Sequence, residues 1–408
     1  MHMPISFAAL ILSVVFLQLS SGASVPLDAL SGLQLGFSTG QIGLLGSAHY
    51  VGFFVGCWWA PRLMGSVGHS RAFAAFTALG AMGLLAHMMV TDPYAWAMFR
   101  MATGLCIAGC YTVIEAWVQA GVTNETRGRV LGGYRVADLG ASLTAQLMIG
   151  ILPPAAYFSY NTLALLCCAA LLPLTLTRAS PPVTTETPRL EPRLAWTISP
   201  LAVVGMLVAA LSGAAFRMVG PVYASAQGLG AGQTALFLAS YVAGGALAQL
   251  PVGWLADRFD RRHVLIGLSA AAIVSSLATV MAGTLGATGT FLMAGIFGLT
   301  TYPIFSVGAA HAHDYARSDQ RVSLSAALMF WFAVGAITAP WLASLLIARF
   351  GPGALFVLIA AGHAGLILYS LLRMRRRPAE TRTPYLYLPR TSFQVGRLLA
   401  RFRDPEGR

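Results

Sequence analysis

The chain has 408 residues, of which 57% are hydrophobic and only 10% are charged, and its mean hydropathy is +0.70. Soluble proteins carry roughly 25% charged residues, so this composition excludes a soluble globular domain and predicts an integral membrane protein with several spans. The formal net charge is +12, and all 26 basic residues are arginine. They lie in alternate loops and in the C-terminal tail, which indicates membrane topology and argues against a partner nucleic acid.

Twelve apolar runs reach the length of about 20 residues that a helix needs to cross a bilayer. They are residues 5–31, 39–63, 71–91, 94–119, 130–151 and 155–177 in the first half, and 198–225, 233–256, 263–282, 289–312, 322–348 and 352–373 in the second. The sequence therefore predicts an all-α integral membrane protein with 12 transmembrane helices in two six-helix halves. The first run could also be read as a signal peptide, but no Lys or Arg precedes it, which favours a transmembrane helix.

A polar segment divides the two halves. Residues 178–199 are rich in proline and too broken to span a membrane, so they predict a cytoplasmic linker. The predicted domains are an N-terminal six-helix half at 1–177, the linker, a C-terminal six-helix half at 200–377 and a basic cytoplasmic tail at 378–408. The tail is interpreted as a disordered, topology-setting segment, with a basic amphipathic helix on anionic lipid as the alternative.

The two halves resemble each other in sequence. Gln41 at the start of the second span matches Gln233 at the start of the eighth, each preceded by glycine, with an offset of 192. Pro26 in the first span matches Pro221 in the seventh, with an offset of 195. These matches predict a parallel repeat of six helices, an arrangement that in transporters places the substrate site between the halves, near the bilayer midplane.

The arginines also predict the orientation. With the N-terminus in the cytoplasm, 22 arginines lie in cytoplasmic loops or in the tail, three lie within spans, and only Arg349 lies in an outer loop. Because cytoplasmic loops of membrane proteins carry an excess of basic residues, both termini are predicted to be cytoplasmic.

A charged turn lies between the eighth and ninth spans. Residues 253–262 read Gly-Trp-Leu-Ala-Asp-Arg-Phe-Asp-Arg-Arg. This string resembles the signature loop of the major facilitator superfamily of transporters, Gly-x-Leu-(Ala)-Asp-Arg-x-Gly-Arg-Arg, and Asp260 stands where the family usually has glycine. The resemblance implies a gating loop whose matching residues include Gly253, Asp257, Arg258, Arg261 and Arg262.

The resemblance covers nearly the whole chain. Arg100 and Gly104 resemble the superfamily's Arg-x-x-x-Gly motif, whose Arg is often tied to proton coupling, and residues 298–303 and 311–314 are similar to a bacterial branch of drug- or sugar-type facilitators. The resemblance implies a multi-pass protein of the bacterial inner membrane that works by alternating access. Two departures are visible: the first-half copy of the loop, 65–71, lacks the Asp and the first Arg, and the fifth span lacks the Gly-Pro string of drug/proton antiporters.

Charged residues within spans are candidates for function, because a charge at bilayer depth is costly unless it is paired. Glu115 in the fourth span, and Arg135 and Asp138 on one face of the fifth, are expected to form a network with one carboxylate in excess. Such a carboxylate can carry a proton. The alternative is that the network only pins two helices together.

A second group of charges is expected toward the outer surface. If Asp28, Arg100 and Arg217 all face the cavity, the outer half holds an excess positive charge that attracts a carboxylate or phosphate. The alternative is that Asp28 pairs with one arginine while the other extends to water.

Lone histidines and polar residues complete the candidates. His49 is a cavity candidate, whereas His87 and His363 lie in peripheral spans and are predicted to be packing residues. His311 and His313 lack a further ligand cluster, so no metal site is predicted. The polar and aromatic residues expected to line the cavity are Tyr111, Gln146, Tyr241, Gln249, Tyr302 and Trp331.

The sequence therefore predicts a secondary transporter that moves a small organic solute by alternating access, coupled to protons, as a monomer and with no cofactor. Efflux of amphiphilic compounds is slightly favoured, and uptake of an organic anion or sugar-like solute is the alternative. A membrane sensor that has lost transport is a rival hypothesis, but a sensor would need no buried titratable groups, and this chain has several. A membrane enzyme is disfavoured because no catalytic cluster is visible in the sequence. Asp257 is expected to pair with Arg127 or Arg129 when the carrier is closed to the cytoplasm.

Overall fold

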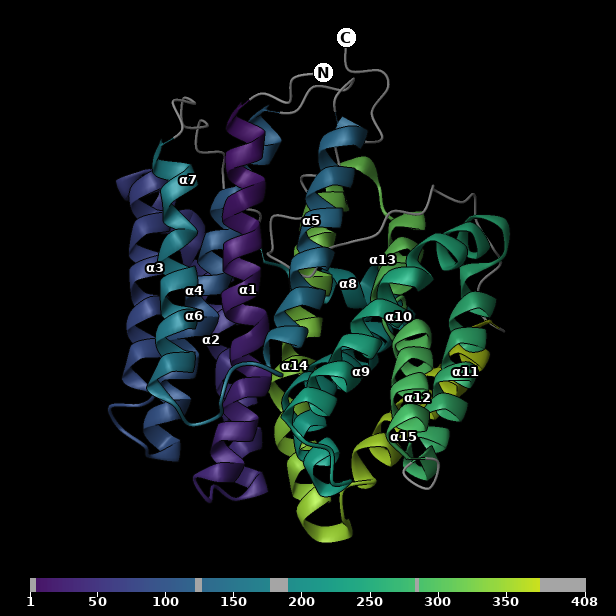
Figure 1. The fold of residues 1–408 in the computed structure, drawn as a ribbon. Coiled ribbons are helices and arrows are strands. Elements are labelled where there is room, and N and C mark those ends of the chain that lie inside the picture. Colours follow the sequence, from purple (N-terminus) through teal and green to yellow (C-terminus); the bar gives the residue numbers. More distant parts are fainter. Residues whose placement is uncertain (1–4, 122–126, 177–189, 283–285, 375–408) are drawn as a thin grey trace.

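The computed structural model describes residues 5–121, 127–176, 190–282 and 286–374, and its regular elements are helices (Figure 1). They are α1 (Ile5–Gln34), α2 (Thr39–Val67), α3 (His69–Ala86), α4 (Pro93–Gly121), α5 (Arg127–Met148), α6 (Tyr157–Ala169), α7 (Leu171–Leu176), α8 (Pro192–Ile198), α9 (Pro200–Ala226), α10 (Ala231–Arg258), α11 (Arg261–Ala282), α12 (Gly286–Thr301), α13 (Ile304–Asp314), the 3-10 helix η2 (Ser318–Gln320), α14 (Arg321–Phe350) and α15 (Ala354–Met374).

Each predicted span falls on one helix or on two consecutive helices. In the described part of the chain, 10 helical segments are long and apolar enough to cross a membrane. The predicted spans 71–91 and 130–151 fall on α3 and α5, which are not among them. The polar residues of α5, Arg135 and Asp138 included, explain its lower apolarity. The all-helical membrane fold is confirmed, and its division into two six-helix halves stays a prediction.

The helix bundle has two ends, each marked by a connection between helices. The Arg261 end is where α10 leads into α11, and the Phe37 end is where α1 leads into α2. In Figure 1 α1–α7, called the first half, lie on the left, and α9–α15, called the second half, on the right, with α5 and α14 between them. The halves touch at the Phe37 end, where a Cβ on Gly43 would overlap Ser344 and one on Gly150 would lie 3.3 Å from Gly232.

The sequence repeat has a structural counterpart at two helix starts. At the start of α2, the Ser38 backbone N–H donates to Gln41 Oε1 at 2.8 Å. At the start of α10, the Gly230 N–H donates to Gln233 Oε1 at 3.3 Å. Both glutamines therefore satisfy a backbone donor that a helix N-terminus otherwise leaves without a partner.

The same repeat is visible where helices pack closely. A Cβ on Gly104 of α4 would lie 2.0 Å from the His49 carbonyl oxygen of α2, and a Cβ on Gly298 of α12 would lie 2.0 Å from that of Tyr241 in α10. His49 and Tyr241 differ by 192 positions, the offset that relates Gln41 to Gln233. Glycine at these crossings lets two backbones meet, as is common between membrane helices.

We predict that Gly104→Ala destabilises the protein by about 1–3 kcal/mol or more, because the obstacle is backbone that cannot rotate away. Gly267→Ala in α11 is the matched control, since a Cβ there meets nothing within 4 Å. Alanine is favoured over glycine by about 1 kcal/mol in a helix, so the control should be neutral or stabilised. Thermal unfolding in detergent compares the two, and equal midpoints would contradict the predicted crossing.

The tenth predicted span, 289–312, is broken in the structure. It forms α12 and α13, which are separated at Tyr302 and Pro303. Proline lacks the N–H of a helical hydrogen bond and disfavours helical geometry in the residue before it, which explains the break.

The predicted linker contains a short helix that the sequence analysis missed. Residues 178–189 of the linker lie outside the described residues, but α8 packs on α14. Trp331 Nε1 donates to the Pro192 carbonyl at 3.0 Å, and the rings of Trp196 and Trp331 lie 6.0 Å apart. These contacts tie the end of the linker to the second half.

Candidate functional site

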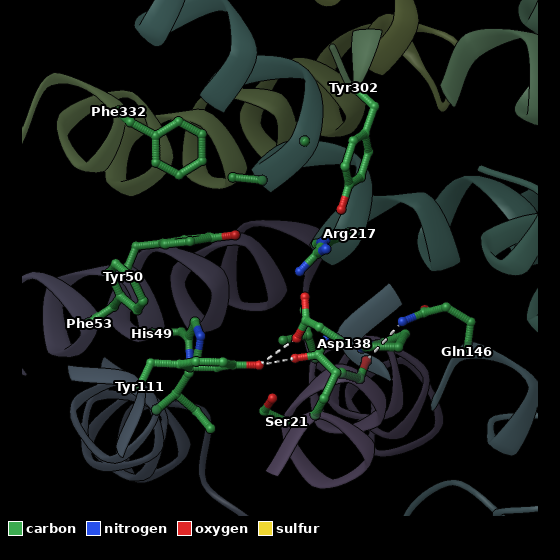
Figure 2. A pocket seen from close by; sticks show the side chains of 17 residues that line it. Ser21, His49, Tyr50, Phe53, Tyr111, Asp138, Gln146, Arg217, Tyr302 and Phe332 are labelled. Atoms are coloured by element: carbon green, nitrogen blue, oxygen red, sulfur yellow. Dashed lines mark hydrogen bonds between the residues drawn. The ribbon is translucent and has the colours of Figure 1, made fainter. Parts of the chain in front are cut away.

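A central cavity lies between the halves, and its empty volume, including space open to solvent, is about 1040 Å³ (Figure 2). The first half contributes side chains from α1, α2, α4 and α5, and the second half from α9, α14 and the break after α12. The α1 residues Gln18, Ser21, Gly22, Val25 and Pro26 are spaced by one, three or four positions, so they form one face of that helix.

A hydrogen-bonded chain of three residues lies on the first-half wall. The Tyr111 hydroxyl oxygen lies 2.9 Å from both Gln18 Oε1 and Asp138 Oδ1. A hydroxyl has one proton, so it donates to only one of them at a time. When Asp138 is ionised, Tyr111 donates to it and the Gln18 amide can turn to donate to Tyr111. When Asp138 is protonated, its carboxyl O–H donates a hydrogen bond to the Tyr111 oxygen, and the Tyr111 hydroxyl then donates to Gln18 Oε1. The chain thus accepts Asp138 in either state.

Arg217 lies opposite this chain, on α9 of the second half. Figure 2 shows its guanidinium pointing toward Asp138, with the Tyr302 hydroxyl on its other side. Among the described residues, no hydrogen bond or ion pair joins Arg217 to the protein. An arginine held in a cavity without a partner offers a planar set of donors to a carboxylate or phosphate.

Six of the predicted cavity residues do line the cavity: His49, Tyr111, Asp138, Gln146, Arg217 and Tyr302. Gln146 Nε2 donates to the Gly22 carbonyl at 3.1 Å, which joins α5 to α1. The buried Nδ1 of His49 has no hydrogen-bond partner among the described residues. The predicted site is therefore brought together in part.

Several lining residues were missed by the sequence analysis. They include Gln18, Ser21, Tyr50, Phe53 and Phe332. Gln18 could have been found, because it is a large amide in an otherwise apolar run and shares a helical face with Pro26. Tyr50 and Phe53 follow His49 within one turn, so the choice of His49 already indicated that face of α2.

Three other predicted cavity residues lie elsewhere in the structure. Tyr241 packs in an aromatic cluster, 4.3 Å between ring centroids from Phe216. Gln249 Nε2 donates to the Gly245 carbonyl one turn earlier in its own helix, and Trp331 contacts the linker helix α8. The predictions had the correct spans but not the correct rotation of each helix, since one residue along a helix turns the side chain by about 100°.

Asp28 and Arg100 do not face the central cavity, which corrects the prediction that they join Arg217 there. Asp28 Oδ2 lies 3.2 Å from Arg100 Nη1 and 3.6 Å from His87 Nε2, and Tyr160 donates to Oδ1 at 2.8 Å. All four side chains are completely buried. Asp28 pairs with Arg100, as in the alternative in which it pairs with one arginine, whereas Arg217 turns to the cavity and not to outside water. His87, predicted as a packing residue, belongs to this cluster.

The second half has a neutral contact in the equivalent place. Tyr223 lies 195 positions after Asp28, the offset that relates Pro26 to Pro221, and its hydroxyl donates to the Thr279 carbonyl at 2.7 Å. Ala294 lies 194 positions after Arg100, the same offset as between Gly104 and Gly298. The fold therefore does not require an ion pair at this point.

Comparisons with known proteins agree with this architecture. The family model described as Major Facilitator Superfamily matches residues 202–386. An uncharacterized MFS-type transporter of Yersinia enterocolitica is 27% identical over 350 residues, covering 85% of this chain and 89% of that protein. By these comparisons the chain is similar to transporters of the major facilitator superfamily. This is a family of transporters and not of enzymes.

Solved structures of transporters share the fold. A crystal structure of a mutant of the nucleoside transporter NupG superposes with a TM-score of 0.76 at 15% identity, covering 91% of this chain and 100% of that one. A bacterial homologue of the human lysosomal transporter Spinster, inward-facing and unoccupied, superposes with a TM-score of 0.71 at 15% identity and covers 99% of both chains. At this identity the likeness establishes the fold alone.

The signature loop of the transporter is held by ion pairs within the second half. The buried Arg261 donates to Asp314 and to the Ala310 carbonyl, the latter at 2.9 Å, which ties the start of α11 to α13. Asp257 is half-exposed and lies 3.5 Å from Arg261. The expected pairing of Asp257 with Arg127 or Arg129 stays a prediction, because those two side chains lie outside the described residues.

Asp260, which replaces the usual glycine of the family's loop, directly precedes α11. Its Oδ1 accepts the Arg262 backbone N–H at 2.9 Å, and its Oδ2 lies 2.7 Å from Arg262 Nη2. Burial alone would raise the pKa of Asp260, but the hydrogen bonds from Arg262 outweigh burial and lower it. In the same loop, Gly253 is buried within α10, and the Arg258 guanidinium lies over the Trp254 ring at 5.4 Å.

The network predicted from Glu115, Arg135 and Asp138 stays a prediction. Glu115 is fully buried in α4 and Arg135 is half-buried in α5, and neither lines the central cavity. Asp138 instead joins Tyr111 and Gln18. Within the described residues, no group of three side chains is placed to hold a metal ion.

Proposed function

We propose that the transporter carries a small organic anion together with a proton. The observation that supports this most directly is Arg217, which makes no hydrogen bond or ion pair among the described residues and lies in the central cavity, facing Asp138. Arg217 would bind the anionic group of the substrate, and Asp138 would hold the proton.

Charge balance couples the two ligands. With Asp138 ionised, the Asp138–Arg217 pair is neutral, so an anion entering this cavity leaves it with a net negative charge. Protonation of Asp138 restores neutrality, and the hydrogen-bonded chain to Gln18 accommodates that proton. Since charge is costly at membrane depth, anion and proton would bind together. An inward proton gradient would then drive uptake.

The walls of the cavity indicate the rest of the substrate. Tyr50, Phe53, Tyr111, Tyr302 and Phe332 surround the Asp138–Arg217 pair. Aromatic walls with few polar anchors are typical of sites for small organic ligands. Aromatic walls would equally suit the apolar body of an amphiphile that is leaving the cell. The choice between anion uptake and amphiphile efflux therefore rests on the charged residues of the cavity. A lipophilic cation would have to lie beside the Arg217 guanidinium, and we therefore place anion uptake ahead of amphiphile efflux.

The contacts at the Phe37 end fit a carrier closed on that side of the cavity. By the arginine bias of the sequence the Phe37 end is external and the Arg261 end cytoplasmic, in the inner membrane of a bacterium. Alternating access would part Gly43 from Ser344, and Gly150 from Gly232, to open the cavity outward.

We predict that Arg217→Gln weakens anion binding by about ten- to a hundredfold, the effect of losing hydrogen bonds to a charged group. The measurement is a thermal-shift titration of the purified protein with organic anions, organic cations and sugars. Arg349→Gln is the matched control, because Arg349 is exposed at the Phe37 end of α14. Stabilisation only by lipophilic cations or neutral amphiphiles, unchanged in Arg217→Gln, would contradict the anion proposal.

A further inference from the structure

A second polar hollow lies at the Arg261 end of the second half. Its empty volume, including space open to solvent, is about 320 Å³, and its lining includes Ser199, Leu201, Arg262, His311, Tyr315 and Arg373. These residues come from the start of α9, the start of α11, the end of α13 with the turn that follows it, and the last turn of α15. None of them lines the central cavity.

Two side chains of this hollow have unused hydrogen-bonding capacity. His311 is only 6% exposed and packs edge-on against Tyr315, yet neither ring nitrogen makes a hydrogen bond to a described residue. Arg373 is half-buried and makes no hydrogen bond or ion pair within the described part of the chain. Buried polar groups are nearly always hydrogen-bonded, so a histidine without a partner in a hollow indicates a ligand.

The N-terminus of α9 adds a backbone donor. The Ser199 side chain accepts from the Ala202 N–H at 3.2 Å, and the Ser199 carbonyl accepts from the Val203 N–H at 3.2 Å. The N–H of Leu201 has no acceptor among the described residues, because the first N–H groups of a helix lack an intrahelical partner. It belongs to the positive end of the helix dipole, where anions are favoured.

The charges of the hollow do not balance. Asp260 neutralises Arg262 through the 2.7 Å contact, so Arg373 has no counter-charge among the described residues that line the hollow, where it lies beside His311 and the Leu201 N–H. A guanidinium, an imidazole and a backbone amide around one small space match the several acceptor oxygens of a phosphate group. We propose that this hollow is a phosphate-binding site, filled by the headgroup phosphate of an anionic lipid or by a free phosphate ion.

The test is a thermal-shift titration of the purified full-length protein in neutral detergent. The probes are dioctanoyl phosphatidylglycerol, dioctanoyl phosphatidylcholine and inorganic phosphate. Arg373→Gln and His311→Leu are each expected to raise the half-maximal concentration of the bound probe about tenfold or more. Arg71→Gln is the matched control, since Arg71 is an exposed arginine near the start of α3, at the same end of the bundle.

The pattern of probes distinguishes the two sources. Stabilisation by phosphatidylglycerol above phosphatidylcholine, weakened in both variants but not in the control, assigns the site to an anionic lipid. The same pattern of variants with inorganic phosphate assigns it to the free ion. The proposal would be overturned if each probe bound equally well to the wild type, to both variants and to the control.

Discussion

Asp138→Asn is expected to abolish proton-driven accumulation of the anion while leaving exchange of anion for anion intact. Asparagine resembles the protonated carboxyl in shape and in lack of charge, and it can still hydrogen-bond to Tyr111. The variant is therefore held in the state that binds the anion and cannot release a proton. For the wild type, anion binding should weaken as the pH rises and Asp138 loses its proton, whereas binding to the variant should not depend on this group.

Transport in proteoliposomes separates these activities. A pH gradient drives accumulation in the wild type, and counterflow from preloaded vesicles measures exchange without net proton movement. Asp319→Asn is the matched control, because Asp319 is exposed and pairs only locally, with Arg317 at 2.8 Å. Accumulation that persists in Asp138→Asn would show that the proton is carried elsewhere.

Replacing Arg100 should produce the largest loss of stability in the chain. Arg100→Leu leaves the completely buried Asp28 carboxylate without its arginine, with His87 and Tyr160 still beside it. Removing one partner of a buried ion pair typically costs about 3–5 kcal/mol, because the remaining charge is uncompensated. The double variant Asp28→Asn, Arg100→Leu should be less damaged than Arg100→Leu alone, since no lone charge remains.

The stability measurement is reversible unfolding in mixed detergent micelles, compared as free energies of unfolding. Arg349→Leu removes an exposed arginine and should change stability by less than about 0.5 kcal/mol. If the double variant is no more stable than Arg100→Leu, then the damage comes from lost packing and not from the lone charge.

Much of the fold could be predicted from the sequence, because an apolar run long enough to cross a bilayer has few alternatives to a helix. Two local features were missed. The break at Tyr302 and Pro303 is hidden in a continuous apolar run, since proline is tolerated within other helices here, including Pro61 in α2 and Pro340 in α14. The docking of α8 depends on Trp331, a contact between segments 139 residues apart that no local pattern announces.

The site was less predictable than the fold, because sequence position indicates the depth of a residue but not the direction in which its side chain points. Arg100 and Arg217 were correctly placed within spans, yet Arg100 turns into the first half and Arg217 turns into the cavity. Phe332 lines the cavity while its neighbour Trp331 contacts α8. Only the contacts between helices resolve such differences.

The two halves carry different residues at equivalent positions, and this difference has an evolutionary consequence. Asp28 and Arg100 stand where the other half has Tyr223 and Ala294. If the halves descend from one duplicated ancestor, any route that changes one residue at a time passes through a protein with a lone charge in a dry interior. Such an intermediate is strongly selected against, so we infer that the two charges are entrenched and are inherited or lost together.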